Sequence, residues 1–378
     1  MSSRRTLLKL IGGGTVLAAT GLSGYVMTQG PSVSARTPWR TAGLYDDPRK
    51  RALSYAILAP NPHNMQPWQV KLTGTTDLEI YCDLDRLLPE TDPFGRQIMI
   101  GFGTFLEHLK LAAAEEGFGL EITPFPEGED MKALDERPIA VVHFKQNTAQ
   151  PDTLFQSILD RRTNRNAYIA KDVEADLLNA IIEASQSSGV TARTTGNTEI
   201  AEKLRDLTWK GHVVEMHTTD ALMETVKVMR IGRSEVAEQP NGLAFDSSLM
   251  SAMKLAGLMS REAMADPNSK AFLEGMKMFQ ERAKSTRAFG WLLNRNETRA
   301  DQLNAGMAYA RLNLKATQLG LAIHPWSQTL QEYEEMKTLY GEVHDLIGEG
   351  QTVQMLVRIG YASDVIAAPR QKLETYIV

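Results

Sequence analysis

The chain has 378 residues, 43% of them hydrophobic, which is enough for one large domain or two smaller ones with a substantial core. Its 41 Lys and Arg residues against 46 Asp and Glu residues leave a formal net charge of −5, which argues against nucleic acid as a partner. Cys82 is the only cysteine, so an internal disulfide and a cysteine-based metal site are excluded, and we expect no metal centre.

The first 35 residues resemble a twin-arginine export signal. Ser3-Arg4-Arg5-Thr6-Leu7-Leu8-Lys9 precedes a weakly apolar, glycine-containing run, and Val33-Ser34-Ala35 fits the small-x-small cleavage rule. This pattern predicts a signal at residues 1–35, contact with the twin-arginine translocation machinery, only transient contact with the membrane, and a periplasmic or other extracytoplasmic location. An uncleaved membrane anchor is the alternative, because the apolar run is nearly long enough to span a bilayer. Cleavage would remove three of the 41 basic residues and no acid, which leaves a net charge of −8.

Beyond this signal, short apolar runs alternate with amphipathic segments. Asp47-Pro48 begins a helix that runs to Ala59, with proline at its first helical position. Further helices are predicted from apolar spacing at residues 98–116, 152–159, 173–185, 198–214, 298–319 and 328–346. Strands are predicted at residues 69–72, 78–82, 139–144 and 353–361. Together these elements indicate an α+β fold around one joint core.

Two segments repeat each other at an offset of 203 residues, which joins Gly103 to Gly306. The same offset relates Leu109 to Leu312 and Gly117 to Gly320. Both segments have helical spacing and end in glycine before a short apolar run, so each is predicted to be the long helix of one half. We assign the halves to residues 36–150 and 151–378 and expect them to form an intrachain pseudo-dimer.

An earlier match between the halves has the shorter offset of 125 residues, from Ile57 to Ile182. The second half is therefore predicted to contain an insertion of about 78 residues, the difference between these two offsets. We assign the insertion to about 232–296, a methionine-rich stretch with two predicted helices at 247–265 and 269–287. Its methionines are typical of ordinary core packing, and the two helices are also suited to form a lid over a ligand site; the two interpretations are not exclusive.

A stiff turn follows the first helix and reads Pro60-Asn61-Pro62-His63-Asn64-Met65-Gln66-Pro67-Trp68. Its three prolines fix φ and cannot continue a helix. Such a turn can present Asn64 and Gln66 as fixed amides toward a flat polar heterocycle. The alternative is a loop between a helix and a strand, with Trp68 in the core.

A basic motif, Asp160-Arg161-Arg162-Thr163-Asn164-Arg165, opens the second half. In an extended chain the alternate residues Arg161, Thr163 and Arg165 point to one side. Two guanidinium groups and a hydroxyl suit a phosphate dianion, because charge-assisted hydrogen bonds from arginine are strong. A solvated surface cluster is the alternative.

Both motifs resemble the flavin-contacting segments of nitroreductase-like FMN proteins, Pro-Ser-Ser-x-Asn-x-Gln-Pro-Trp and Arg-Arg-Ser-x-Arg/Lys. The resemblance implies a nitroreductase-like fold with bound FMN. It assigns the flavin phosphate to Arg161, Thr163 and Arg165, and the remaining flavin contacts to Pro60, Asn61, Pro62, His63, Asn64 and Gln66. Asn61 and Pro62 stand where the family usually has two small hydroxyl residues, so Asn61 and Asn64 are expected to replace the lost hydrogen bonds.

Two later segments extend this resemblance. Gly320–Trp326 occupies the place where the family's backbone passes the edge of the flavin ring, which assigns His324 and Pro325 to the cofactor site. His324 is either a proton donor there or a packed residue. The strand at 355–361 matches the family's closing strand, whose basic residue meets the phosphate, and this makes Arg358 a third cation.

The lidded, two-half arrangement resembles the Acg-type branch of the family. Thr91-Asp92-Pro93-Phe94-Gly95-Arg96 also resembles a segment of that branch, although no chemical role is assigned to it. In the family the two motifs of one flavin site come from opposite subunits of a dimer, so we expect them to meet here in one chain. The second half has no equivalent of the Gln-Pro-Trp turn, which predicts one competent FMN site and one degenerate site.

These observations predict an exported FMN-dependent oxidoreductase of nitroreductase type. Its substrate would be a small electrophilic, nitro or quinone-like molecule, and a small-molecule electron donor is implied. We name no catalytic side chain, because flavin chemistry needs none and the protein supplies position and water exclusion. The alternatives are a protein that binds and sequesters FMN under a lid, and a cofactor-free scaffold for partner binding.

Overall fold

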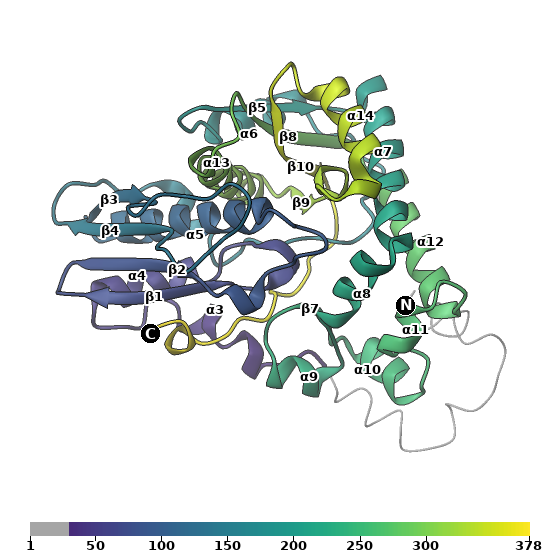
Figure 1. The fold of residues 1–378 in the computed structure, drawn as a ribbon, viewed down its shortest axis with the longest axis horizontal. Helices are drawn as coiled ribbons and strands as arrows, with labels where there is room; N and C mark the ends of the chain where they lie inside the picture. Colours follow the sequence, from purple (N-terminus) through teal and green to yellow (C-terminus); the bar gives the residue numbers. More distant parts are fainter. Residues whose placement is uncertain (1–29) are drawn as a thin grey trace.

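The computed structural model describes residues 30–378. Most of the predicted export signal, at residues 1–35, therefore lies outside the described residues. The described chain has an α+β fold with two four-stranded antiparallel sheets and one short parallel pair of strands (Figure 1). Within residues 30–378, no helix is both long enough and apolar enough to cross a membrane.

The first sheet has the strand order β1-β2-β4-β3. Its strands and the helices around them are α3 (Pro38–Thr41), α4 (Pro48–Ala56), β1 (Trp68–Thr73), β2 (Asp77–Cys82), α5 (Arg96–Glu115), β3 (Gly119–Pro124) and β4 (Ala140–Lys145). The side chains of β2 alternate between half-buried and buried, as expected for a sheet with one covered face.

The second sheet has the corresponding order β5-β8-β10-β9. Its strands and the helices around them are α6 (Ala175–Ala184), β5 (Val190–Thr195), β8 (Ala288–Asn294), α13 (Arg299–Gln318), β9 (Ala322–Pro325), α14 (Lys337–Ile347) and β10 (Thr352–Gly360). The long helices α5 and α13 follow the second strand of their sheets and pack against each other between the sheets. The repeated segments found in the sequence are thus the two central helices of the fold.

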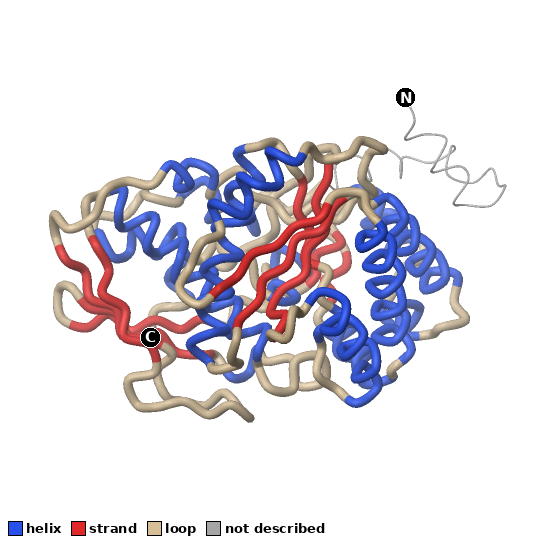
Figure 2. The backbone as a smooth tube through the Cα atoms, turned by 90° about the horizontal axis from the view of Figure 1, so that it is seen from above, coloured by secondary structure: helices blue, strands red, loops and turns tan. Residues whose placement is uncertain are grey.

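The insertion in the second half begins earlier and ends earlier than predicted. All inserted elements lie between β5 and β8, at residues 196–287, instead of about 232–296. They are α7 (Glu199–His217), α8 (Thr219–Lys227), β6 (Met229–Ile231), α9 (Arg233–Glu238), β7 (Leu243–Phe245), α10 (Ser248–Leu255), α11 (Arg261–Ala265) and α12 (Lys270–Ser285). Residues 288–294 form a strand in which every side chain is buried, so they belong to the sheet and not to a lid. Figure 2 shows the inserted helices grouped beside the strands of the sheets.

Two of the predicted helices are interrupted. The helix expected at 247–265 is split into α10 and α11, because Gly257 adopts a φ of +69° and Ser260 caps a new helix start. The helix expected at 328–346 begins only at Lys337, after two short 3₁₀ turns. Here the Leu330 carbonyl and the Glu332 carboxylate both bond to Arg96 of α5, which holds the chain away from a helical path.

Both ends of the described chain pack on the first half or the insertion. The Ala35 carbonyl accepts a hydrogen bond from the Arg370 amide at 2.8 Å, and Ala35 is buried. Arg36 forms an ion pair with Asp246 at 2.8 Å. At the other end, the Val70 amide of β1 bonds to the Tyr376 carbonyl at 2.7 Å. A cut after Ala35, as predicted, would therefore pass through a packed segment.

Candidate functional site

A cavity of about 1850 Å³ lies beside the central helices α5 and α13 and is also lined by the inserted helices. Pockets for a single small molecule usually measure about 300–1000 Å³, so this one has room for more than one ligand. The turn after α4, the start of α5, the basic motif, β9 and the helices α7, α8, α10 and α12 all contribute to its wall. The cavity thus combines both predicted motifs with the insertion.

The turn after α4 presents Pro60, Asn61, Pro62 and His63 to the cavity. His63 has a φ of +44°, in the left-handed region that a residue with a Cβ rarely adopts. Thr104 of α5 holds this turn, because its hydroxyl donates to the Pro60 carbonyl at 2.5 Å. Backbone strain of this kind is concentrated at ligand sites, where surrounding contacts maintain it.

Asn64 and Gln66 do not reach the cavity, contrary to the prediction that they present amides to a heterocycle. The Asn64 amide donates to the carbonyls of Gly242 and Pro369. Gln66 is fully buried, and its amide donates to the Pro240 carbonyl at 2.8 Å. Both side chains therefore fasten the turn to the insertion and the C-terminal segment.

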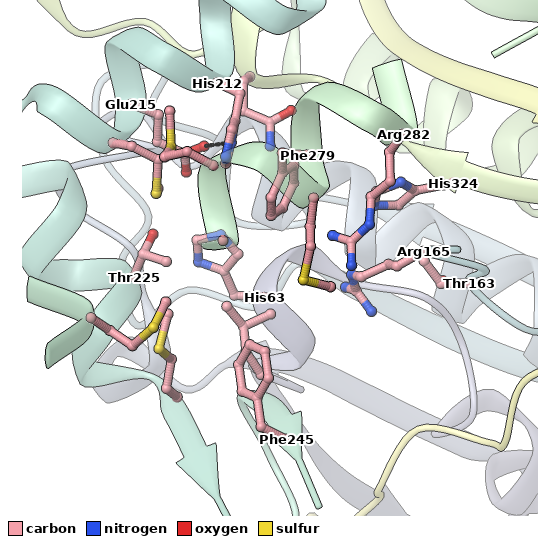
Figure 3. A pocket seen from close by; sticks show the side chains of 18 of the residues that line it. His63, Thr163, Arg165, His212, Glu215, Thr225, Phe245, Phe279, Arg282 and His324 are labelled. Atoms are coloured by element: carbon pink, nitrogen blue, oxygen red, sulfur yellow. Dashed lines mark ion pairs between the residues drawn. The ribbon is translucent and has the colours of Figure 1, made fainter. Parts of the chain in front are cut away.

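A cationic end of the cavity is formed by Thr163, Arg165 and Arg282, with Arg282 coming from α12. Figure 3 shows the three side chains close together beside His324. Arg165 is exposed within the cavity and makes no hydrogen bond or ion pair with a described residue. Burial, together with the charges of Arg358 and Arg165, lowers the pKa of Arg282 to about 10. A bound anion would relieve this repulsion, since no described carboxylate pairs with either Arg165 or Arg282.

Arg161 and Arg358 differ from the prediction, because neither lines the cavity. Arg161 is 2% exposed, and its Nε and Nη1 atoms have no partner among the described residues. Arg358 is fully buried and donates to the carbonyls of Asn164 and Asn166, at 3.3 and 2.8 Å. Arg358 therefore holds the backbone of the basic motif in place from inside the protein.

His324 and Pro325 line the cavity as predicted. The Nδ1 atom of His324 lies 2.9 Å from the Nε atom of Arg358, which can only donate. Burial lowers the pKa of His324 well below its ordinary value, and nearby arginines add to this effect. The neutral ring must then hold its proton on Nε2, which gives the cationic end a hydrogen-bond donor with no charge.

Sequence reasoning missed several cavity residues, including Tyr309 of α13 and Phe279 and Arg282 of α12. It also left Thr91–Arg96 without a role, and the structure makes this segment an anchor between the start of α5 and the segments on either side of α14. Asp92 accepts two backbone N–H groups at the start of α5, both at 2.9 Å. Arg96 is buried and reaches Glu332 and the Gln354 carbonyl in the second half. Among the described residues, no group of three His, Cys, Asp or Glu side chains is placed to hold a metal.

No family model matches the chain. Over 325 residues it is 28% identical to "Putative NAD(P)H nitroreductase acg" of Mycobacterium tuberculosis H37Rv. The matched region covers 85% of this chain and 91% of the relative. It is 26% identical over 321 residues to "Putative NAD(P)H nitroreductase Rv3131" of the same strain, covering 83% and 85%. The chain is a relative of these nitroreductase-like proteins.

A solved structure of an FMN and NADPH-dependent nitroreductase, NfnB from sphigopyxis sp. strain HMH, matches with a TM-score of 0.40 at 16% identity. The match covers 60% of this chain and 98% of NfnB.

Proposed function

We propose that this nitroreductase-like chain is an FMN-dependent oxidoreductase that uses a nicotinamide nucleotide as electron donor. The observation that carries the proposal is the cationic end of the cavity, where Arg165 and Arg282 lack carboxylate partners and face a strained turn. A phosphate group attached to a flat heterocycle fits this arrangement of charge and shape. The names of the relatives support the same reaction class.

The proposal assigns a task to each of the main cavity residues. Thr163, Arg165 and Arg282 would bind the phosphate, and Pro60–His63 would contact the ring system. Bound FMN would supply the acceptance and release of two electrons. His324 holds a proton at Nε2 near the cationic end, and Phe279 with the other α12 side chains excludes water.

The proposal also includes the pseudo-dimer and the export of the protein. The repeated sheet order and the contact between α5 and α13 support two related halves within one chain. The Arg4-Arg5 motif supports export by the twin-arginine machinery. Replacing both arginines with lysine is expected to keep the protein in the cytoplasm, as measured by cell fractionation. Unchanged export of that variant would remove this part of the proposal.

Absorbance spectra and flavin titrations test the cofactor. Purified protein incubated with FMN is expected to gain a flavin spectrum, which NADPH then bleaches without oxygen. Arg165→Ala should weaken FMN binding by at least about tenfold, the effect of one lost charge-assisted hydrogen bond. It should leave the binding of riboflavin, which has no phosphate, unchanged. Protein that never acquires a flavin spectrum would overturn the proposal.

Arg162 provides the matched control for Arg165. Its guanidinium bonds to the Leu159 and Arg161 carbonyls and does not line the cavity. Arg162→Ala is therefore expected to bind FMN as the unmodified protein does. A bound flavin that neither NADPH nor a small external reductant can bleach would support sequestration instead, although the volume of the cavity favours an enzyme with a second ligand.

A further inference from the structure

A second polar cluster lies at the end of the cavity formed by the insertion, away from the arginines. His212 and Glu215 come from α7, Thr225 from α8, and Gln328 and Gln331 from the segment after β9. Figure 3 shows Phe279 between His212 and Arg282, so this aromatic ring separates the two polar ends. The rings of Phe279 and His212 are stacked, with centroids 3.7 Å apart.

This second cluster contains an unusual number of unsatisfied polar atoms. Buried polar groups in proteins nearly always have a hydrogen-bond partner. Here five buried atoms have none among the described residues: His212 Nδ1, Thr225 Oγ1, Gln328 Oε1, Gln331 Oε1 and the Tyr333 hydroxyl. Four of these five residues line the cavity. Their convergence therefore indicates a ligand that supplies polar atoms at this end.

Glu215 lies at the centre of the cluster and is 2% exposed. One of its oxygens accepts a hydrogen bond from the Gln331 amide at 3.3 Å. The other lies 3.9 Å from His212 Nδ1, which is too far for a hydrogen bond. Burial raises the pKa of Glu215 to about 7. Below that pH its carboxyl group is neutral and can donate a hydrogen bond to a ligand.

The other titratable groups around Glu215 do not neutralise a carboxylate. Burial lowers the pKa of His212 to about 3, so its ring is uncharged near neutral pH. Tyr333, just before the 3₁₀ turn at Glu334–Met336, has a pKa raised by burial and by Glu215. Glu224 of α8 repels a negative charge on Glu215, and Arg282 of α12 acts on His212 from the far side of Phe279.

The wall next to this cluster is apolar and adaptable. We call it the methionine chamber, and it consists of Met216, Leu222, Met229, Met253, Met259, Phe272 and Met276. Methionine side chains are flexible and polarizable, and they accommodate apolar ligands of varied shape. A single carboxyl donor at the end of an apolar chamber is suited to a ligand with one acceptor group.

We propose that the insertion builds a second ligand subsite, which binds a mainly apolar molecule through a neutral carbonyl oxygen that accepts a hydrogen bond from Glu215. The subsite stands on the buried Glu215 carboxyl group in the wall of the cavity, on the methionine chamber and on the volume of the cavity. Only one part of this proposal rests on the proposed function, namely that the ligand of the subsite is the electron acceptor of the flavin enzyme.

Calorimetric titration of the purified full-length protein tests the subsite with two matched probes. The first is 2-acetylnaphthalene, and the second is 2-isopropenylnaphthalene, in which a methylene group replaces the carbonyl oxygen. At about pH 5.5, below the pKa of Glu215, the ketone should bind about tenfold more tightly, as one hydrogen bond predicts. At about pH 8.5 the preference should disappear, because a carboxylate cannot donate.

Three variants separate Glu215 from other groups. Glu215→Gln keeps an N–H donor and should prefer the ketone at both pH values. Glu215→Leu has no donor and should lose the preference at both. Glu202→Gln, on the exposed side of α7, should behave as the unmodified protein. Circular dichroism checks that each variant is folded.

Equal affinity for both probes at low pH would overturn the proposal, because it would show that Glu215 donates no hydrogen bond to the carbonyl oxygen. If the preference for the ketone still depends on pH in Glu215→Gln, another group must supply the titrating donor. That result would also overturn the proposal. The flavin spectrum of the same samples distinguishes the two proposals. The expected ketone pattern in protein that never binds flavin would support the subsite while refuting the proposed function. Bound flavin without this pattern would refute the subsite alone.

Discussion

Gly103 of α5 and Gly306 of α13 meet where the two central helices cross. A Cβ atom added to either residue would lie 2.7 Å from the Cα atom of the other. It would also lie 2.1 Å from a carbonyl oxygen, that of Leu303 or Ile100 respectively. The helices can approach this closely only because both residues lack a side chain. The repeated glycines are therefore the contact point of the two central helices.

Gly103→Ala is expected to lower the free energy of unfolding by at least about 3 kcal/mol, the upper range for overpacking a core, because the atoms in the way belong to the backbone. Urea denaturation measures the effect. Gly341→Ala in α14 is the control, since a Cβ there meets no atom within 4 Å. It should stabilise the protein by about 0.5–1 kcal/mol through helix propensity. Equal effects of the two substitutions would contradict the close helix crossing.

Arg282 is expected to lower the stability of the flavin-free protein and to strengthen the binding of FMN. Its guanidinium lies near Arg165 and Arg358 and stacks over Phe279 at 4.7 Å, without a described carboxylate partner. Arg282→Met keeps most of the volume and removes the repulsion, so the flavin-free protein should gain about 1 kcal/mol of stability.

The same Arg282→Met variant should bind FMN at least about tenfold more weakly, because one cation for the phosphate is gone. Thermal unfolding with and without FMN measures both quantities. Lys284→Met, at an exposed position of α12, is expected to change neither. A variant that loses stability without FMN, or binds FMN normally, would show that Arg282 serves only the packing of the lid.

Arg358 is a positioning residue, and its substitution should act on the protein before any cofactor binds. Its guanidinium joins His324, Asn164 and Asn166. Arg358→Lys keeps the charge but cannot make these contacts together. We expect the flavin-free variant to lose at least about 2 kcal/mol of stability, because buried acceptors are left unsatisfied.

A direct phosphate ligand would behave differently at position 358. In that case Arg358→Lys would leave the stability of the flavin-free protein nearly unchanged, and its main effect would be weaker FMN binding. Chemical denaturation of the flavin-free protein, combined with FMN titration, therefore separates positioning from direct contact.

The sequence was most informative where local patterns and spatial contacts coincide. The 203-residue offset predicted α5 and α13, because helix spacing and a close glycine contact both leave a signature in the chain. Pro60–His63, Thr163, Arg165, His324 and Pro325 were predicted as site residues and come together in one cavity. Asn64, Gln66, Arg161 and Arg358 are turned into the protein, because their partners lie far away in sequence and no local pattern reveals them.

The insertion was harder to interpret because its helices bury polar residues on an otherwise apolar face. In α7 the buried positions Ala201, Leu204 and Thr208 continue at helical spacing to His212 and Glu215. An ionisable pair within such a stripe was the available signal for a site, and sequence reasoning missed it. Strand β8 was also assigned to the lid, because a continuous apolar run looks the same in a buried strand as in a buried helix segment.

Glu215 should make stability depend on pH in a direction opposite to that of a salt-bridged carboxylate. Its pKa rises from the ordinary value of 4.5 to about 7 on folding, so between these values the unfolded chain ionises while the folded protein retains the proton. Unfolding then releases a proton, and the free energy of unfolding falls as the pH rises through this window. Glu215→Gln lacks this titration, so its stability relative to the unmodified protein should increase by about 3 kcal/mol from pH 4.5 to 7 and then level off. Urea denaturation across this range measures the difference, in which the other titrating groups cancel. Glu202→Gln should show no such trend, and a difference that does not vary with pH would mean that Glu215 is ionised in the folded protein.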